Sequence, residues 1–277
     1  MQNFKRDKKS GLYIPSDVNS GLRVNPYKYE DLQRQWTIPV RDGQRAKRYF
    51  ERKRQERLEG IKLAVSFNAT NSLNGGSGTS STSFNVTVSG SLTQAAMAVG
   101  ISLYGGTAIT GATVGGAAAS LVTGTSNTFP GCSAIYGKYI GAVSGTIAIV
   151  ATWTDSSAWV VGACLFEGVD SSTPFINGAN DVQSDAGPCD VTITNPANNM
   201  GFFNFNVIGS IDILNTPSGQ ERWLLNGASD SQGGGQTVAG GVTSASYQMS
   251  GTQWNQAAGC SVLAASGAAA RFILGTH

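Results

Sequence analysis

The residues that could do chemistry in this chain are few, and most of them are carboxylates. Histidine occurs once, as the last residue His277, which argues against histidine-based catalysis and against most zinc sites. After residue 62 there are two glutamates and seven aspartates, of which Glu167 and Asp170 fall in one strand-to-loop turn. A glycosidase needs two carboxylates that flank a sugar bond. Because no spacing singles out such a pair, we expect a protein that is not an enzyme.

Metal sites are the next chemistry to consider. Asp181, Asp185 and Asp190 cluster in one segment, and oxygen-rich loops can bind calcium. Their spacing fits no calcium-loop pattern, and aspartate is common in turns, so we favour a turn cluster and keep calcium as the alternative. The cysteines include no C-x-x-C pair, so the sequence predicts no zinc site and no cofactor. The four cysteines are Cys132, Cys164, Cys189 and Cys260.

Two of these cysteines and several tryptophans have apolar neighbours. Cys164 and Cys260 lie in apolar strand patterns, and we expect buried, free thiols there. Trp153 and Trp159 also lie in apolar strands and are predicted to pack in the core. Trp223, within the sequence ERWL, has no such context, so it is the residue we name as a candidate glycan contact.

Charge divides the chain at about residue 62. Residues 1–62 contain 16 of the 19 Lys and Arg and 8 of the 17 Asp and Glu, a net charge of +8. Residues 63–277 contain three basic residues and nine acidic ones, a net charge of −6. Glycine is divided the other way, with 4 residues in the first segment and 32 in the second. This asymmetry predicts a basic arm, residues 1–62, joined to a body of different character, residues 63–277.

The body is predicted to consist of strands. Apolar and polar residues alternate in 83–88 and again in 146–153, and a period of two places the apolar side chains on one sheet face. Residues 158–166 are apolar on both faces, as in a central strand. Shorter strands are predicted at 191–194, 203–207, 247–249, 261–263 and 271–274. Many short strands without a helical pattern predict an all-β sandwich or barrel.

Clusters of Gly, Asn, Ser and Pro between these strands are predicted to be turns, because they supply a positive or preset φ. They include 74–78, 130–131, 177–178, 217–219 and the run at 233–235. Two stretches, 152–158 and 253–259, share a pattern in which a strand ends in Trp and a turn leads to a buried return strand. This pattern fits paired hairpins within one double-layered sandwich.

The same stretches carry a family resemblance. The sequence FEGVDSSTPF at 166–175, YGGTAI at 104–109 and the Trp254 stretch resemble a jelly-roll module of virion-surface proteins. Such modules occur in capsid decoration proteins and tail fibres of tailed bacteriophages and in some bacterial surface proteins, and the resemblance covers residues 84–265. It implies a jelly-roll-like antiparallel β-sandwich used for structure or attachment, and a homo-oligomer whose subunit number the residues do not fix.

The arm has a different composition and matches no family. Pro15, Pro26 and Pro39 argue against a long helix in the first forty residues. Asp42 can cap a helix over 43–59 that Gly60 ends. Because this helix is too polar to form its own core, we predict an extended anchoring arm with one short α-helix.

We expect the arm to bind other virion proteins, either major capsid or tail proteins. Aromatic residues spaced along a basic segment suit docking onto an acidic protein surface, where they would order on binding. A disordered, solvated tail is the first alternative; nucleic acid is a weaker one, because eight acidic residues dilute the charge. The predicted anchor residues are Tyr13, Tyr27, Tyr29, Trp36, Arg45, Arg48, Tyr49, Phe50 and Arg52.

Taken with the resemblance to virion-surface modules, which implies the phage origin, these patterns lead us to expect a non-enzymatic structural protein of a phage virion, made in the host cytoplasm. No run of about 20 apolar residues predicts a membrane span, and the first ten residues lead into no secretory signal. We favour a capsid decoration protein, because no shaft, coiled coil or repeat separates arm and body. The alternative is a short tail fibre or receptor-binding protein that recognises host surface glycans; a sandwich glycosidase or a bacterial surface lectin ranks lower.

Overall fold

The computed structural model describes residues 4–6, 13–15, 64–76, 79–105, 108–125, 131–154, 158–183, 188–208, 214–227, 231–249 and 254–265. The chain divides into two compact units, residues 1–55 and 56–277. In the first unit, β1 (Phe4–Arg6) pairs antiparallel with β2 (Tyr13–Pro15). The helix predicted at 43–59 and the strand predicted at 271–274 lie outside the described residues.

The described part of the second unit, which is the body, contains strands and no helix. Accordingly, no helix long and apolar enough to cross a membrane is found among the described residues. The strands are β3 (Ser66–Gly75), β4 (Ser81–Tyr104), β5 (Ile109–Val114), β6 (Ala117–Ala118), β7 (Ser120–Thr125), β8 (Gly131–Trp153), β9 (Ala158–Glu167), β10 (Phe175–Gln183), β11 (Cys189–Thr192), β12 (Met200–Ile208), β13 (Leu214–Pro217), β14 (Gln220–Asn226), β15 (Ser231–Ala239), β16 (Ser244–Met249) and β17 (Trp254–Val262).

The predicted alternation is confirmed in the two longest strands. In β4, Phe84, Val86 and Val88 are buried while the residues between them are exposed. In β8, Ile147 and Ile149 are buried in the same way. Every residue of β9 except the last is buried, as predicted for a strand covered on both faces.

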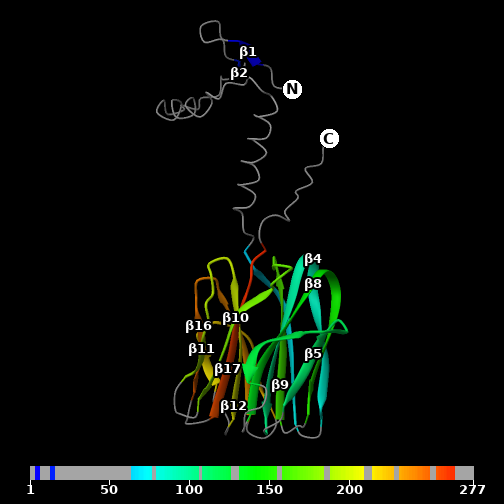
Figure 1. The fold of residues 1–277 in the computed structure, drawn as a ribbon, viewed down its shortest axis with the longest axis vertical. Helices are drawn as coiled ribbons and strands as arrows, with labels where there is room; N and C mark the ends of the chain where they lie inside the picture. Colours follow the sequence, from blue (N-terminus) through cyan, green and yellow to red (C-terminus); the bar gives the residue numbers. More distant parts are fainter. Residues whose placement is uncertain are drawn as a thin grey trace. The chain divides into compact units, whose positions relative to one another are not determined.

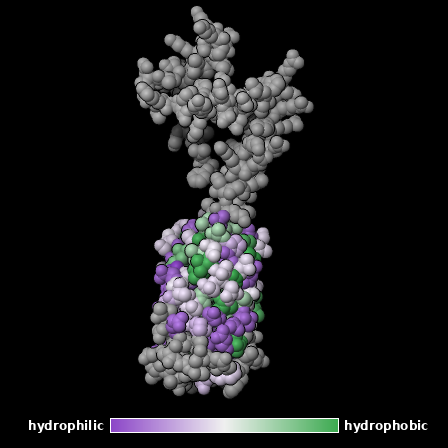
Figure 2. Space-filling view, turned by 90° about the vertical axis from the view of Figure 1, so that its left-hand side faces the viewer, coloured by the Kyte–Doolittle hydropathy of each residue, from purple (hydrophilic) through white to green (hydrophobic). Residues whose placement is uncertain are grey.

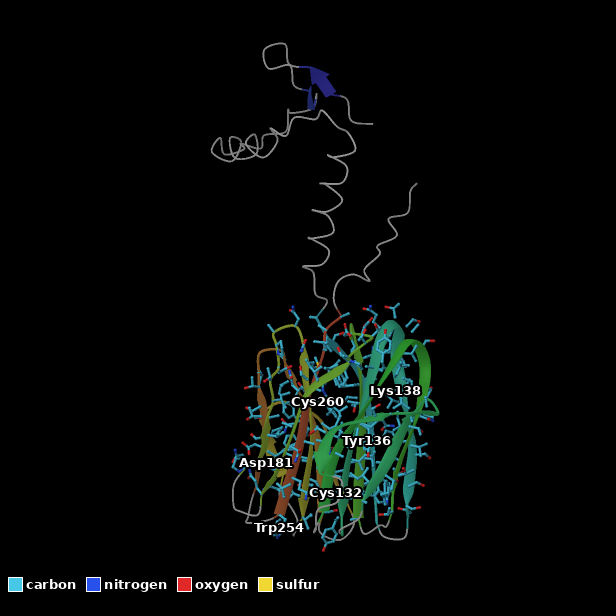
Figure 3. All side chains as sticks on the ribbon, viewed as in Figure 1. Cys132, Tyr136, Lys138, Asp181, Trp254 and Cys260 are labelled. Atoms are coloured by element: carbon cyan, nitrogen blue, oxygen red, sulfur yellow. The ribbon has the colours of Figure 1, made fainter. Side chains whose placement is uncertain are left out.

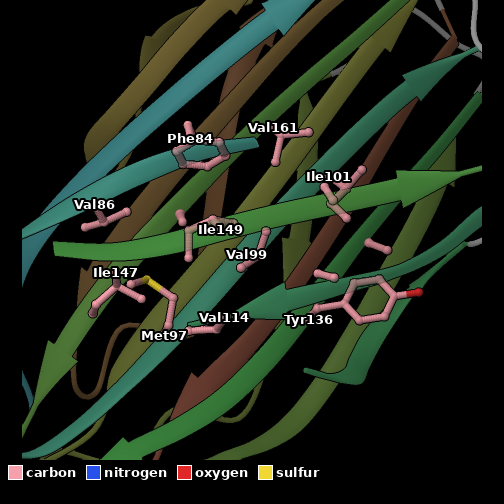
Figure 4. Packing of buried hydrophobic residues seen from close by; sticks show 14 of the residues in the cluster. Phe84, Val86, Met97, Val99, Ile101, Val114, Tyr136, Ile147, Ile149 and Val161 are labelled. Atoms are coloured by element: carbon pink, nitrogen blue, oxygen red, sulfur yellow. The ribbon is translucent and has the colours of Figure 1, made fainter. Parts of the chain in front are cut away.

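Strands β4 and β8 each supply two layers, because both bend halfway along. Residues 81–87 of β4 pair with 146–152 of β8, whereas residues 95–104 of β4 pair with 131–141 of β8 and also with β9. Register shifts separate the two halves. Side chains of the first halves then face those of the second halves, and Phe84, Ile149, Val99 and Tyr136 belong to one hydrophobic cluster (Figure 4).

Two further sheets complete the body. A five-stranded sheet has the order β10-β17-β12-β15-β14, and a three-stranded sheet has the order β11-β16-β13. The second halves of β4 and β8, with β9, pack on the five-stranded sheet through a cluster that includes Phe166 and Phe202. The five-stranded sheet packs on the three-stranded sheet through a cluster that includes Phe205 and Tyr247. The body therefore has four β layers and three apolar interfaces (Figure 1).

The two halves of the body have the same strand order. One inner layer runs β3-β9-β4-β8-β7 and the other runs β10-β17-β12-β15-β14; the outer layers run β4-β8-β5 and β11-β16-β13. The expected all-β, antiparallel class is confirmed. Where the sequence predicted one double-layered sandwich, the described strands form two, packed back to back. The alternation of apolar and polar residues shows which face of a strand is buried. It does not show how many sheets are stacked beyond that face.

The glycine run 233–235 is a correction to the predicted turns, because it lies in the middle of the buried strand β15. A Cβ on Gly235 would lie 2.3 Å from the Trp223 ring, and a Cβ on Gly162 of β9 would lie equally close to it. The indole thus fits between the two inner sheets only because both strands lack a side chain there. Trp254 is also misplaced by the sequence pattern, since it begins β17 rather than ending a strand before a turn.

Candidate functional site

The described chain of the body begins and ends at the same end of the layers. The N–H of Val65 donates to the carbonyl of Asn198 (3.0 Å), and the N–H of Ala264 donates to Oδ1 of Asn199 (3.1 Å). Ala264 also forms an antiparallel bridge with Val169. We call this end the junction end and define it by residues 64–65, 168–173, 195–199, 240–243 and 263–265; the bends of β4 and β8 lie at the same end. The opposite end, where β4 and β17 begin and β8 ends, is the far end (Figure 1).

A buried hydrogen-bond network holds the loops of the junction end together. Asn195 Nδ2 donates to the carbonyls of Ala239 and Val242, at 3.0 and 2.9 Å. Ser261 Oγ donates to Asn195 Oδ1 and accepts a hydrogen bond from Asn199 Nδ2, both at 2.9 Å. Because both amide side chains have a partner at each end, the network fixes one arrangement of these loops.

A second network joins the two sandwiches within the interface that also contains Phe202. Asn204 Nδ2 lies within hydrogen-bond distance of Ser133 Oγ (2.9 Å) and Ser102 Oγ (3.1 Å), which belong to β8 and β4. On the same strand, Asn206 Nδ2 donates to the carbonyl of Leu103 (2.9 Å). Sequence analysis did not single out these asparagines, although their alternation with phenylalanine in FFNFN placed them on one face.

An open groove of about 570 Å³ lies where β10 approaches β7 and β8. Asp170 Oδ1 shapes its rim by accepting the N–H groups of Ser172 and Thr173, both at 2.9 Å. Asn177 has φ 53° at a register shift in β10, so the predicted turn there is a bulge. The lining therefore combines hydroxyl and amide groups with two aromatic rings. It consists of Ser120, Leu121, Val122, Gly137, Lys138, Tyr139 and residues 171–178.

The carboxylates predicted to cluster are partly described. Gln183 Nε2 donates to Asp181 Oδ2 (2.6 Å) and to Asp190 Oδ1 (3.1 Å), so one amide joins the two acidic side chains. Asp185 lies outside the described residues. In the described ranges, no group of three or more His, Cys, Asp or Glu side chains is arranged to hold a metal ion.

The tryptophans divide into buried and exposed ones. Trp223 is only 5 % exposed, and its ring centroid lies 5.9 Å from that of Phe202 in the core, so the candidate glycan contact presents no free ring face. Trp153 and Trp159 are buried, as predicted. Trp254, at the far end, is 47 % exposed (Figure 3).

The predicted anchor residues fall almost entirely outside the described residues. Tyr13 belongs to β2, of which only the backbone is described. The other eight remain predictions from sequence: Tyr27, Tyr29, Trp36, Arg45, Arg48, Tyr49, Phe50 and Arg52.

The outer face over β11 and β16 carries mixed residues. Thr192, Ser244 and Gln248 are exposed there. Figure 2 shows hydrophobic residues scattered among hydrophilic ones on this side of the body. Such a mosaic is typical of a solvent-facing sheet.

All four cysteines are buried and free, which confirms the prediction for Cys164 and Cys260. Burial raises the pKa of Cys132 to about 12 and that of Cys164 to about 12, and it also raises the pKa of Cys189 and Cys260. We therefore expect no reaction with a thiol reagent near pH 8 in the folded protein, and reaction of four thiols after denaturation. Rapid labelling of the folded chain would contradict this burial.

The same thiols predict a direction for stability against pH. An ordinary cysteine pKa of 9.0 applies to the unfolded chain, and the folded values are higher, so the folded state holds protons that the unfolded state loses. The stabilising contribution is complete below about pH 9 and is lost as the pH rises toward about 12. Denaturant titrations at several alkaline pH values would measure this fall.

No protein-family model matches the chain, and no curated protein matches it.

Proposed function

We propose that this chain is a non-enzymatic structural protein of a phage virion, held to the particle by residues 1–62 and displaying the body outward. The observation that carries the proposal is the separation of roles along the chain. The arm concentrates 16 of the 19 basic residues, whereas the body fills three apolar interfaces with its own side chains. A body that buries its own core leaves the aromatic, basic arm free to bind a partner.

The strand order supports a jelly roll as the finer fold of each sandwich. A jelly roll is two packed sheets built from eight strands in two Greek keys. In each half of the body the first strand lies beside the last, as β3 does beside β9 and β10 beside β17. We propose a tandem pair of jelly rolls.

Capsid decoration is the role we favour within this proposal. The two sandwiches share a buried interface that includes Phe166, Phe202 and Cys260, so the body is one thick block rather than a chain of separate modules. The arm, with its net charge of +8, then reaches across an acidic surface of capsid or tail proteins. We propose that the body forms homo-oligomers on the particle.

The groove favours the second candidate function, recognition of a host surface glycan. Its hydroxyl and amide groups and the Tyr139 ring are the groups that bind sugars through hydrogen bonds and stacking. If this function is the correct one, the full chain binds a glycan array and Leu121→Trp, in the groove wall, removes the binding. Val182→Trp is the matched control, because Val182 is also exposed but lies outside the groove.

Deleting the arm tests the favoured function. We expect a 63–277 chain to be soluble and β-rich by circular dichroism and to melt cooperatively, because all three apolar clusters lie within it. Expressed where particles assemble, it should be missing from purified particles. Normal occupancy of particles by the truncated chain would show that the arm is not the anchor.

A further inference from the structure

We infer that the junction end of the body faces the particle and that the far end points away from it, an inference that rests on the proposed function. The body has two ends, and the function alone does not say which one lies against the partner. The structure distinguishes them, because the arm must leave from only one.

The place where the chain enters the body is fixed by covalent geometry. The arm ends at residue 62, and Val65 is already hydrogen-bonded to Asn198 at the junction end. The described chain therefore enters the body at Ala64, next to this contact. Strand β3 then runs to the far end over ten residues, which is a distance of about 30 Å. An arm anchored on the particle therefore tethers the body at its junction end, and the far end lies the length of a strand beyond that point of attachment.

The exposed residues of the junction end are compatible with the particle surface that the proposal requires. That surface must be acidic in order to bind the basic arm. The exposed described residues of the junction end are small and uncharged: Ala64, Ser171, Ser172, Thr173, Pro196, Ala197, Asn198, Gly241, Val242 and Thr243. Its carboxylate Asp170 already accepts two backbone N–H groups. The nearby Glu167, at the end of β9, is half-buried. The joined pair Asp181 and Asp190 lies farther along the strands, toward the far end. Apart from Asp170 and Glu167, the junction end therefore adds no negative charge that would repel an acidic surface.

The junction end is also rigid enough to form a defined contact. The buried Asn195–Ser261–Asn199 network ties the loop at 195–199 to the end of β15 and to the end of β17. A surface that is fixed before binding loses less conformational entropy when a partner covers it. The partner we infer is thus the protein surface of the particle that carries the acidic groups facing the arm.

Single-cysteine labelling on particles tests the orientation. The four native cysteines are buried and give little background. Val242 at the junction end and Trp254 at the far end are each 47 % exposed, so Val242→Cys and Trp254→Cys form a matched pair. In the free full-length protein, both variants should react with a maleimide at similar rates. On purified particles, we expect Val242→Cys to lose its labelling and Trp254→Cys to keep it.

A second pair of single-cysteine variants serves if a variant of the first pair does not fold. Ala197→Cys replaces Val242→Cys at the junction end, and Ser80→Cys replaces Trp254→Cys at the far end; both positions are exposed. Protection of the far-end thiols with labelling of the junction-end thiols overturns the inference, as does equal labelling at both ends. Incorporation of the 63–277 chain would instead contradict the arm as anchor, and the labelling pattern would still report the orientation. Absence of the full chain from particles would overturn both.

Discussion

Particles assembled with a Trp36→Ala, Tyr49→Ala double variant are expected to lack this protein, whereas washing wild-type particles with high salt is expected to leave it in place. Both residues belong to the predicted anchor set in the arm. Buried aromatic anchors commonly contribute about 2 kcal/mol or more each to binding. Losing two of them weakens binding by about 1,000-fold, which is enough to empty the particle.

Salt distinguishes this mechanism from a purely electrostatic one. Exposed charge pairs are screened beyond about 10 Å at 0.1 M ionic strength, so an arm held by charge alone would leave the particle as salt rises. The control is Tyr49→Phe, which keeps the ring and should keep normal occupancy. Quantifying the protein in purified particles by mass spectrometry gives the readout. Loss of the wild-type protein in high salt, with retention of the double variant, would assign the anchoring to the arginines.

Trp223→Ala is expected to lower the free energy of unfolding by about 3–5 kcal/mol, the range for large aromatic residues in cores. The indole fills the space between the two inner sheets, where Gly162 and Gly235 leave room for it. Neither glycine has a side chain that could move into the cavity, so collapse around an alanine is limited. Urea denaturation followed by circular dichroism measures the change.

Trp254→Ala is the matched control for this prediction, because Trp254 is 47 % exposed and its truncation should cost less than about 1 kcal/mol. If Trp223→Ala has no more effect than Trp254→Ala, the indole does not support the interface between the sandwiches. A stable Trp223→Ala variant that had lost glycan binding would instead favour the role suggested by the sequence.

The separation of the chain into a basic arm and a glycine-rich body could be read from sequence, because charge and composition add up residue by residue. The same is true of the strand faces. Phe84, Val86 and Val88 alternate with polar residues, and burial follows that alternation because successive side chains of a strand point to opposite faces. Burial of Cys164 and Trp153 was predictable for the same reason, since their immediate neighbours are apolar.

The candidate sites could be predicted less well. The junction end depends on Val65, Asn198 and Ala264, which are far apart in the sequence and meet only through the sheet order. The groove depends in the same way on β7, β8 and the segment 171–178. For Trp223, the sequence left burial open and made the ring a candidate glycan contact, because its burial comes from glycines on two other strands rather than from its neighbours.

What the sequence by itself determined was therefore local: the charge difference between residues 1–62 and the body, the strand faces and the buried thiols. The tertiary structure decided the number of layers, the bend of β4 and β8, and the place of glycines 233–235 in a buried strand. The physical reason is that periodicity and turn propensity act over a few residues, whereas a Cβ-free strand is required by a ring that packs on it from elsewhere. A glycine can lie in a turn or can let another side chain pack closely against the strand backbone. Which of the two occurs depends on the side chain that packs there, in this case the Trp223 ring.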